Sequence, residues 1–198
     1  MRIAYVTPWG CGLGHAARGA ALAARGIRAF GPVPRQHGRA GFGSLLVPKG
    51  FEASVDWEAR ALAWHPDLLL VDLAWDAPVL LAAIPGWLLA RWTDIGSQRA
   101  WGRRISIEPA ADVIPGITHR IPPIVGPDRW RPPDGSEVRA GYNAWWESVW
   151  YGWHDRVRWT TDGSPERQAR IDAGPVLMAE NGANVLMAMV HAALGDGS

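Results

Sequence analysis

The chain has 198 residues, of which 48% are hydrophobic and 20% charged, and its formal net charge is +1. This length and composition are typical of a soluble globular protein of one domain or two small ones. The near-neutral charge argues against a protein whose whole surface binds polyanions such as nucleic acid, although it is compatible with a local basic patch. The single cysteine, Cys11, excludes an internal disulfide framework and a metal site built from several cysteines.

No targeting or membrane segment is expected. The N-terminus lacks a basic region followed by an uninterrupted apolar run, so no signal peptide is predicted. The longest apolar stretch, residues 79–90, is interrupted by Pro85 and Gly86 and is too short to span a bilayer. We therefore expect a cytoplasmic protein.

Strand and helix patterns alternate along the first part of the chain. The apolar run DLLLVD, residues 67–72, has no polar alternation, which is typical of a parallel strand buried on both faces. The alternation predicts an α/β fold with a Rossmann-like, doubly wound parallel sheet. The predicted strands are residues 3–6, 27–30, 45–47, 67–72, 87–90 and 105–107, and the predicted helices are residues 15–25, 57–64 and 77–83.

A proline-rich stretch, IPPIVGPDRWRPPDGS at residues 121–136, has no periodicity and indicates a boundary. The predicted organisation is an N-terminal unit at 1–122, a linker at 123–136 and a shorter C-terminal unit at 137–198. In the last unit we expect helices over residues 137–151, from 165 onward and over 179–194, with a strand at 156–160.

The loop after the first strand is rich in glycine. Gly10, Gly12 and Gly14 can adopt positive φ and leave backbone N–H groups free to face an anion at the helix N-terminus. The spacing differs from G-x-G-x-x-G because His15 occupies the place of the third glycine, and no Gly-Lys-Ser/Thr follows. Two interpretations remain: an anion-binding loop with a functional histidine, or a glycine turn with a helix-capping histidine.

The segment GLGHAARGAALAARG, residues 12–26, resembles the first loop and helix of GT-B glycosyltransferases. The resemblance implies that His15 is the general base for an acceptor hydroxyl. It also implies an orienting aspartate in DLAW, residues 72–75, where this chain is one residue shorter than the family's D-x-F-x-x-W. Asp72 is the expected partner and Asp76 the rival, while Asp72 as a helix cap is the structural alternative. Trp9 and Trp75 flank this pair and are the expected substrate contacts on the acceptor side.

Two further segments, AGYNAWWESVWYG and SPERQARIDAG, resemble the donor-binding signature of the same family in the same order. The family's acidic residue and glutamine are usually adjacent, whereas here one residue separates them, and the early strands of a full C-terminal domain have no counterpart. The resemblance implies a diphosphate contact at Gly141, Tyr142 and Asn143, together with Gly12 and Gly14, a ribose contact at Glu147, and sugar contacts at Glu166 and Gln168.

These features predict a glycosyltransferase that moves a sugar from a nucleotide-sugar to an acceptor hydroxyl. No cofactor is expected besides the nucleotide-sugar as co-substrate. The six histidines are scattered and no Asp-x-Asp is present, so we expect no metal site. The alternatives are a non-catalytic nucleotide-sugar binding protein and a sugar-nucleotide epimerase-like enzyme.

Thirteen tryptophans are an unusually high number. Tyr142, Trp146, Trp150 and Trp153 have helical spacing, which fits either core packing or stacking on a ligand. Because the second unit is short, we expect exposed aromatic surface and hence a homo-oligomer, most simply a dimer.

Arginines interleaved with tryptophans suggest DNA as one candidate acceptor, through an extruded hydroxylated base. Ordinary solvated arginines are the alternative. The residues concerned are Arg35, His37, Arg39, Arg99, Trp101, Arg103, Arg104, His119, Arg120, Arg129, Trp130 and Arg131.

Overall fold

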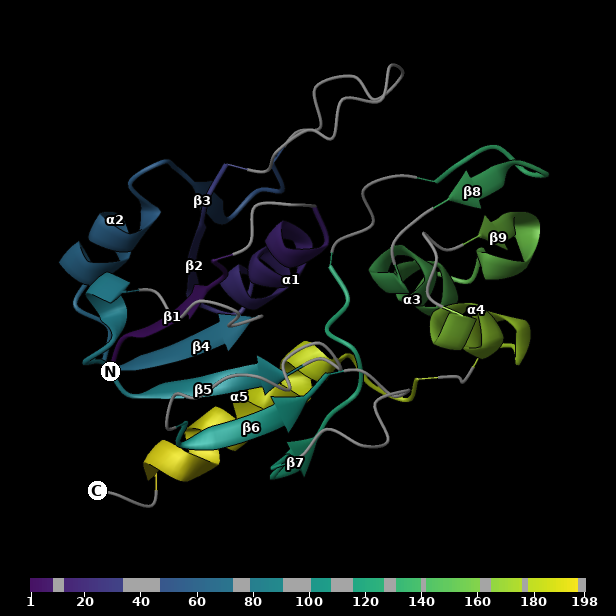
Figure 1. Ribbon diagram of the computed structural model, residues 1–198. Helices are drawn as coiled ribbons and strands as arrows, with labels where there is room; N and C mark the ends of the chain where they lie inside the picture. The colour runs from purple at the N-terminus through teal and green to yellow at the C-terminus, as the bar shows by residue number, and fades with distance from the viewer. Residues whose placement is uncertain are drawn as a thin grey trace.

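The computed structural model describes residues 1–8, 13–33, 47–72, 79–90, 101–107, 116–126, 131–139, 142–160, 165–175 and 178–195. Its main body is an α/β layer structure with a seven-stranded sheet flanked by helices (Figure 1). The α/β, Rossmann-like class predicted from the alternation of elements is therefore confirmed at this coarse level.

All seven strands run parallel, in the order β3-β2-β1-β4-β5-β6-β7. The order reverses between β1 and β4, because the chain winds outward from β1 to β3 and then crosses to β4 on the other side. This reversal is the topological switch point of a doubly wound sheet. The strands are β1 Ile3–Val6, β2 Arg28–Gly31, β3 Phe51–Ala53, β4 Leu68–Asp72, β5 Gly86–Ala90, β6 Arg103–Ser106 and β7 His119–Arg120.

Helices cover both faces of the sheet. Helices α1 (Leu13–Ala23) and α5 (Gly182–Gly195) lie on one face, while α2 (Trp57–Ala63) and the short 3-10 helix η1 (Val79–Leu81) lie on the other. Side chains of a strand alternate between the two layers. In β4, Leu68 and Leu70 pack on the α1 side and Leu69 and Val71 on the α2 side. The same alternation directs Asp72, at the end of β4, to the α1 side.

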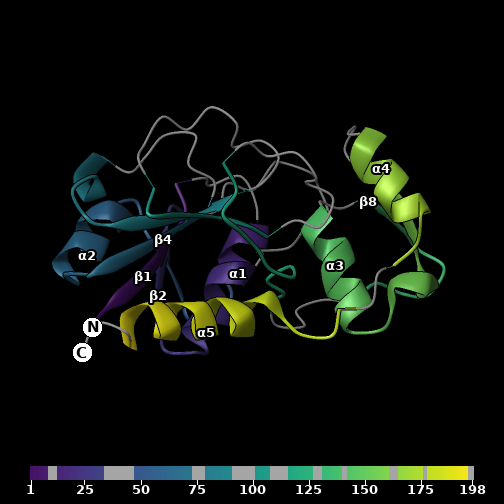
Figure 2. The ribbon, with the colours of Figure 1, turned by 90° about the horizontal axis from the view of Figure 1, so that it is seen from below.

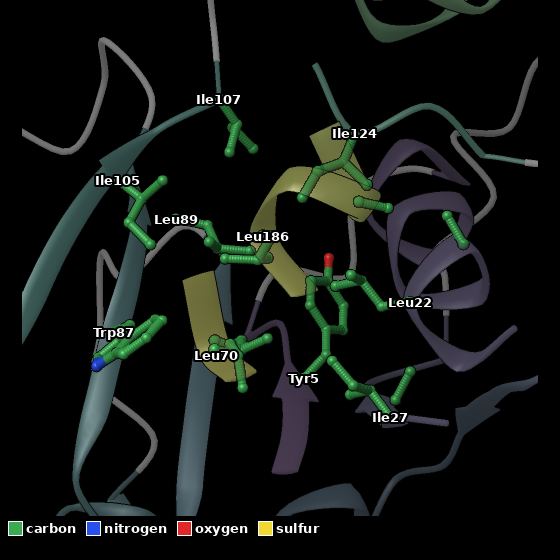
Figure 3. Packing of buried hydrophobic residues seen from close by; sticks show 14 of the residues in the cluster. Tyr5, Leu22, Ile27, Leu70, Trp87, Leu89, Ile105, Ile107, Ile124 and Leu186 are labelled. Atoms are coloured by element: carbon green, nitrogen blue, oxygen red, sulfur yellow. The ribbon is translucent and has the colours of Figure 1, made fainter. Parts of the chain in front are cut away.

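The last helix returns to the first sheet. Its residues Ala183, Leu186 and Val190 are buried in one cluster with Leu70 and Leu89. Figure 3 shows Leu186 in this cluster with Leu70 and Leu89. Figure 2 shows α5 beside α1 on the same side of the sheet. Residues 182–195 therefore complete the core of the N-terminal unit, although the expected division of the chain assigns them to the C-terminal one.

The start of the proline-rich stretch is also part of this core. Ile121, Ile124 and Val125 are buried, and the side-chain amide of Asn181 donates to the carbonyl of Val125 at 3.0 Å. The oxygen of the same amide accepts from the backbone N–H of Ala183 at 2.9 Å, so Asn181 joins residues 121–126 to the first turn of α5. Residues 123–126, which we predicted to begin a linker, are thus held against α1 and α5.

The crossing of this stretch and α5 requires glycine at position 182. A Cβ built on Gly182 would lie 1.9 Å from the carbonyl oxygen of Pro122, which is backbone and cannot rotate aside. We expect Gly182→Ala to lower the free energy of unfolding by about 3 kcal/mol, the upper part of the usual overpacking cost. Urea unfolding followed by circular dichroism measures this. Gly195→Ala, at a position where the added Cβ meets open space, is the control on the same helix.

The smaller unit contains a two-stranded parallel sheet and three helical segments, drawn apart from the main sheet in Figure 1. The prediction of one helix over residues 137–151 is wrong at its start, because residues 137–139 pair with β9. Alternation fits the strand, since Glu137 is exposed while Val138 is buried in a cluster with Trp153 and Val157. The elements are β8 Glu137–Arg139, α3 Tyr142–Trp150, η2 His154–Arg156, β9 Arg158–Thr160 and α4 Pro165–Asp172.

Other predicted boundaries also shift. Within the described part of the helix predicted at 77–83, residues 79–81 form η1, and residues 77–78 lie outside the described residues. The strand predicted at 45–47 lies largely outside them as well. Strands β3 and β7 were not predicted, since three-residue and two-residue strands carry too little periodicity to be recognised.

The tryptophans of the second unit form its core. Trp145 and Trp146 are each 2% exposed, and Trp153 stacks on Trp159 with ring centroids 5.6 Å apart. Helix α3 ends at Trp150, so Trp153 does not continue its face. None of the tryptophans in the described ranges is exposed, and Tyr151 is the exposed aromatic side chain found there in the second unit. The oligomeric state remains a prediction, measurable by light scattering.

Candidate functional site

Four polar side chains meet beneath the carboxyl ends of β1 and β4, at the switch point of the sheet. Tyr5 lies in β1, in register with Leu70 of β4, and therefore shares the α1 side with Asp72. Helix α1 covers this side and carries His15 and Arg18, which are three residues apart and so lie on one helical face. All four are buried: Tyr5 and Asp72 are 0% exposed, Arg18 is 2% exposed and His15 is 6% exposed.

One carboxylate oxygen collects the contacts of the other three side chains. Asp72 Oδ2 lies 2.5 Å from the Tyr5 hydroxyl, 2.7 Å from Arg18 Nε and 3.2 Å from His15 Nδ1. Arg18 also reaches the imidazole, with Nη2 at 2.7 Å from His15 Nδ1. The Tyr5 hydroxyl lies 2.9 Å from the backbone carbonyl of His15, which ties β1 to the first turn of α1.

The charges of the cluster follow from its burial and its contacts. Burial would raise the pKa of Asp72, but the Arg18 cation and then His15 outweigh it and hold that pKa well below its usual range. Burial works against the Arg18 cation, but the Asp72 carboxylate raises its pKa above the ordinary value. Burial and then the Asp72 charge raise the pKa of Tyr5 well above 10.0. At neutral pH, the cluster therefore contains a carboxylate, a guanidinium and a neutral phenol.

Two polar atoms of the cluster have no hydrogen-bond partner among the residues that the structure describes. They are Asp72 Oδ1 and Arg18 Nη1, both buried. A buried charged group is normally fully hydrogen-bonded. The chain segments that follow β1 and β4, residues 9–12 and 73–78, lie outside the described residues.

The structure brings together the predicted catalytic pair, His15 and Asp72, and places Gly14 in the first turn of α1. The donor residues lie in the second unit: Glu147 is half-buried in α3, and Gln168 donates to Asp172 on its own helix at 2.9 Å. For Tyr142, Asn143 and Glu166 the backbone alone is described, at the starts of α3 and α4. Trp9, Gly12, Trp75, Asp76 and Gly141 lie outside the described residues.

Sequence reasoning missed Tyr5 and Arg18. Arg18 was recognisable from the sequence, because it is the one charged residue in the alanine-rich helical segment GHAARGAALA. An apolar helix of this kind packs on the sheet and buries the side chains that face it. A buried arginine requires an acidic partner, and Asp72 ends the neighbouring strand. Tyr5 had a weaker signal, since its hydroxyl lies in a strand that is otherwise apolar.

The basic and aromatic array is only partly described. Arg103 stacks its guanidinium on Trp87, 4.6 Å from the ring centroid, and Arg131 lies 3.7 Å from Asp134. These two side chains are therefore engaged within the protein. Arg35, His37, Arg39, Arg99, Arg129 and Trp130 lie outside the described residues, and Trp101, Arg104, His119 and Arg120 are found on or beside β6 and β7.

Neither a metal site nor a membrane-spanning helix is found in the described ranges. No group of three or more His, Cys, Asp or Glu side chains there could hold a metal ion. No helix in the same ranges has the length and apolar character needed to cross a membrane.

A hollow of about 380 Å³ between α1, α3 and α5 is lined by Arg25, Lys49 and Tyr151 among others. It borders the C-terminal half of α1 and does not include His15.

Comparison with known proteins adds no further constraint. No family model matches the chain. No curated protein and no solved structure matches it either. The structure therefore shows an α/β protein with a parallel, Rossmann-like sheet. A buried cluster lies at the switch point of this sheet and consists of Tyr5, His15, Arg18 and Asp72.

Proposed function

We propose that this protein is a glycosyltransferase of the GT-B type that uses a nucleotide-sugar donor. The observation that carries the proposal is the contact between His15 and Asp72, 3.2 Å apart at the switch point of the sheet. Ligands of doubly wound proteins bind outside the carboxyl ends of the strands at this point. A histidine with a buried carboxylate behind it is the usual arrangement of a general base.

The proposed reaction uses His15 on the acceptor side. With Asp72 accepting the Nδ1 proton, Nε2 removes the proton of the acceptor hydroxyl as its oxygen attacks the anomeric carbon of the sugar. The bond from that carbon to the diphosphate breaks, and its electron pair leaves with the nucleoside diphosphate. The backbone N–H groups at the start of α1 and of α3 would stabilise the departing charge. A hydroxylated base in DNA is one candidate for the acceptor.

On the donor side, we assign the ribose hydroxyls to Glu147 in α3. We expect Glu147→Ala to weaken nucleotide-sugar binding by about 1.5–3 kcal/mol, the value of a hydrogen bond to a charged group. Isothermal titration calorimetry measures the affinity. Glu180→Ala, an exposed glutamate before α5, is the control. Unchanged affinity of the Glu147 variant would remove this residue from the donor site.

A panel of nucleotide-sugars tests the function itself. Each is added to the protein, thermal unfolding is followed, and released nucleoside diphosphate is measured with and without hydroxyl acceptors, including hydroxymethylated duplex DNA. A transferase is stabilised by one donor and releases its diphosphate faster when the acceptor is present. Stabilisation without any release favours the binding protein, and the absence of both results contradicts the nucleotide-sugar proposal.

A non-catalytic nucleotide-sugar binding protein is the second candidate. The contact of Arg18 Nη2 with His15 Nδ1 at 2.7 Å favours it, because a guanidinium can only donate. The imidazole that accepts this hydrogen bond carries its proton on Nε2 and is then a donor toward a ligand. The structure offers no corresponding support for the epimerase-like alternative, which needs additional acidic and basic groups around the sugar.

A further inference from the structure

His15 Nδ1 has two close polar neighbours, Arg18 and Asp72, but it cannot form hydrogen bonds with both of them at the same time. This nitrogen lies 2.7 Å from Arg18 Nη2 and 3.2 Å from Asp72 Oδ2. The guanidinium is always a donor and the carboxylate, with its lowered pKa, is always an acceptor. A neutral imidazole nitrogen either accepts from the first or donates to the second, so only one of the two contacts is a hydrogen bond at any moment.

The shorter contact indicates which of the two is formed. The distance from Arg18 is that of a good charge-assisted hydrogen bond, whereas the distance to Asp72 is at the long end of the usual range. Asp72 Oδ2 also has two other donors, the Tyr5 hydroxyl and Arg18 Nε. The carboxylate oxygen therefore keeps two donors without His15, while Nδ1 has the guanidinium directly beside it.

We propose that Arg18 is a positioning residue that holds His15 in the tautomer protonated on Nε2, so that the histidine is not a base as long as Arg18 contacts Nδ1. The sense of this control rests on the proposed function: a transferase needs the opposite tautomer, with Nδ1 donating to Asp72 and Nε2 free of its proton. Activation then requires Arg18 to release Nδ1. A base withheld in this way does not activate water against a bound donor.

The geometry of the side chain supports this role. Arg18 directs its guanidinium back along α1 toward His15, one turn nearer the helix N-terminus, which is the usual direction of long side chains in helices. Its fork contacts Asp72 through Nε and His15 through Nη2, and Nη1 has no partner among the described residues. A lysine has one terminal nitrogen and cannot reproduce this two-point contact.

The test measures the tautomer directly. Long-range proton–nitrogen correlation spectra of ¹⁵N-labelled protein distinguish protonated from unprotonated ring nitrogens, and the loss of signals in His15→Gln assigns them. In the wild type we expect unprotonated Nδ1 and protonated Nε2. In Arg18→Lys we expect the proton to move to Nδ1. Arg25→Lys is the control, since Arg25 lies just after the end of α1 and bonds to Asn184 instead of the cluster.

The outcomes separate this proposal from the proposed function, because the spectra require no substrate. A wild-type protein protonated on Nδ1, or a folded Arg18→Lys protein with an unchanged tautomer, overturns the role of Arg18 even if the protein transfers sugar. The expected spectra support it even if no donor is found. If Arg18→Lys does not fold, the wild-type spectrum alone decides.

Discussion

The His15→Ala variant is expected to transfer sugar more slowly by a factor of about 10²–10⁴ and to retain donor binding. Removing a general base has an effect of this size on the rate of the chemical step alone. The fold should tolerate the change. The Arg18 and Asp72 pair remains intact without the imidazole, and its shortest contact, 2.7 Å, does not involve His15. The measurement is the initial rate of nucleoside diphosphate release with a verified acceptor, together with donor affinity by calorimetry.

His191→Ala is the matched control, since His191 is exposed on α5. Its rate should equal that of the wild type. A His15→Ala protein that turns over at close to the normal rate would exclude His15 as the base and leave the buried cluster a structural role. A protein that loses donor binding as well would indicate that His15 contacts the donor.

Arg18→Met is expected to lower the free energy of unfolding by about 3–5 kcal/mol, because it leaves the Asp72 carboxylate buried without its cation. Both side chains are almost fully buried, so solvent does not take over the role of the guanidinium. The double variant Arg18→Met with Asp72→Asn removes both charges and should recover much of the loss. Urea unfolding of the four proteins forms a double-mutant cycle. Additive single effects would contradict the coupling.

The surface pair of Arg28 and Glu52 is the control, since both side chains are partly exposed. Arg28→Met should cost no more than about 1 kcal/mol. A loss as large as that of Arg18→Met would mean that burial does not determine the difference.

The buried pair of Arg18 and Asp72 also makes the free energy of unfolding depend on pH in the acidic range. The pKa of Asp72 in the folded protein lies below its ordinary value of 3.8, so the unfolded chain binds a proton there before the folded protein does. The stabilisation is complete above this value and decreases as the pH falls below it. The difference in unfolding free energy between the wild type and Asp72→Asn should therefore shrink between about pH 4 and pH 2. In this range the unfolded wild type takes up a proton at Asp72 that the folded protein does not bind. A constant difference would contradict the charged state of Asp72.

The sequence was most informative where one periodicity applied over a whole element. The run at 67–72 has no polar residue inside it, and it predicted both β4 and the position of Asp72 at its end. The pairing of His15 with Asp72 came from the resemblance of two separate loops, which is information that periodicity does not contain. Residues 137–139 were assigned to a helix because a three-residue strand depends on its partner β9, which is distant in sequence.

Long-range packing explains what else was missed. Nothing local in GANVLMAMVHAALG shows that α5 packs on the first sheet, since its apolar side chains would suit either unit. Arg18 was recognisable as unusual, but its choice of partners depends on how α1 lies over β1 and β4. The tautomer of His15 depends on that choice, so the prediction that His15 pairs with Asp72 does not by itself predict which ring nitrogen carries the proton.

The return of α5 to the first sheet also has a consequence for the order of events during synthesis. Domains that are continuous in sequence can fold one after another as they leave the ribosome. Here Leu186 and Val190 fill the core around Leu70 and Leu89, so that layer stays open until nearly all of the described chain has emerged. Until then the nascent sheet exposes apolar surface, which is a general property of aggregation-prone intermediates. Its closure comes after the tryptophan-rich unit has been made. Folding of the sheet is expected to begin locally and to be completed only after α5 has been made.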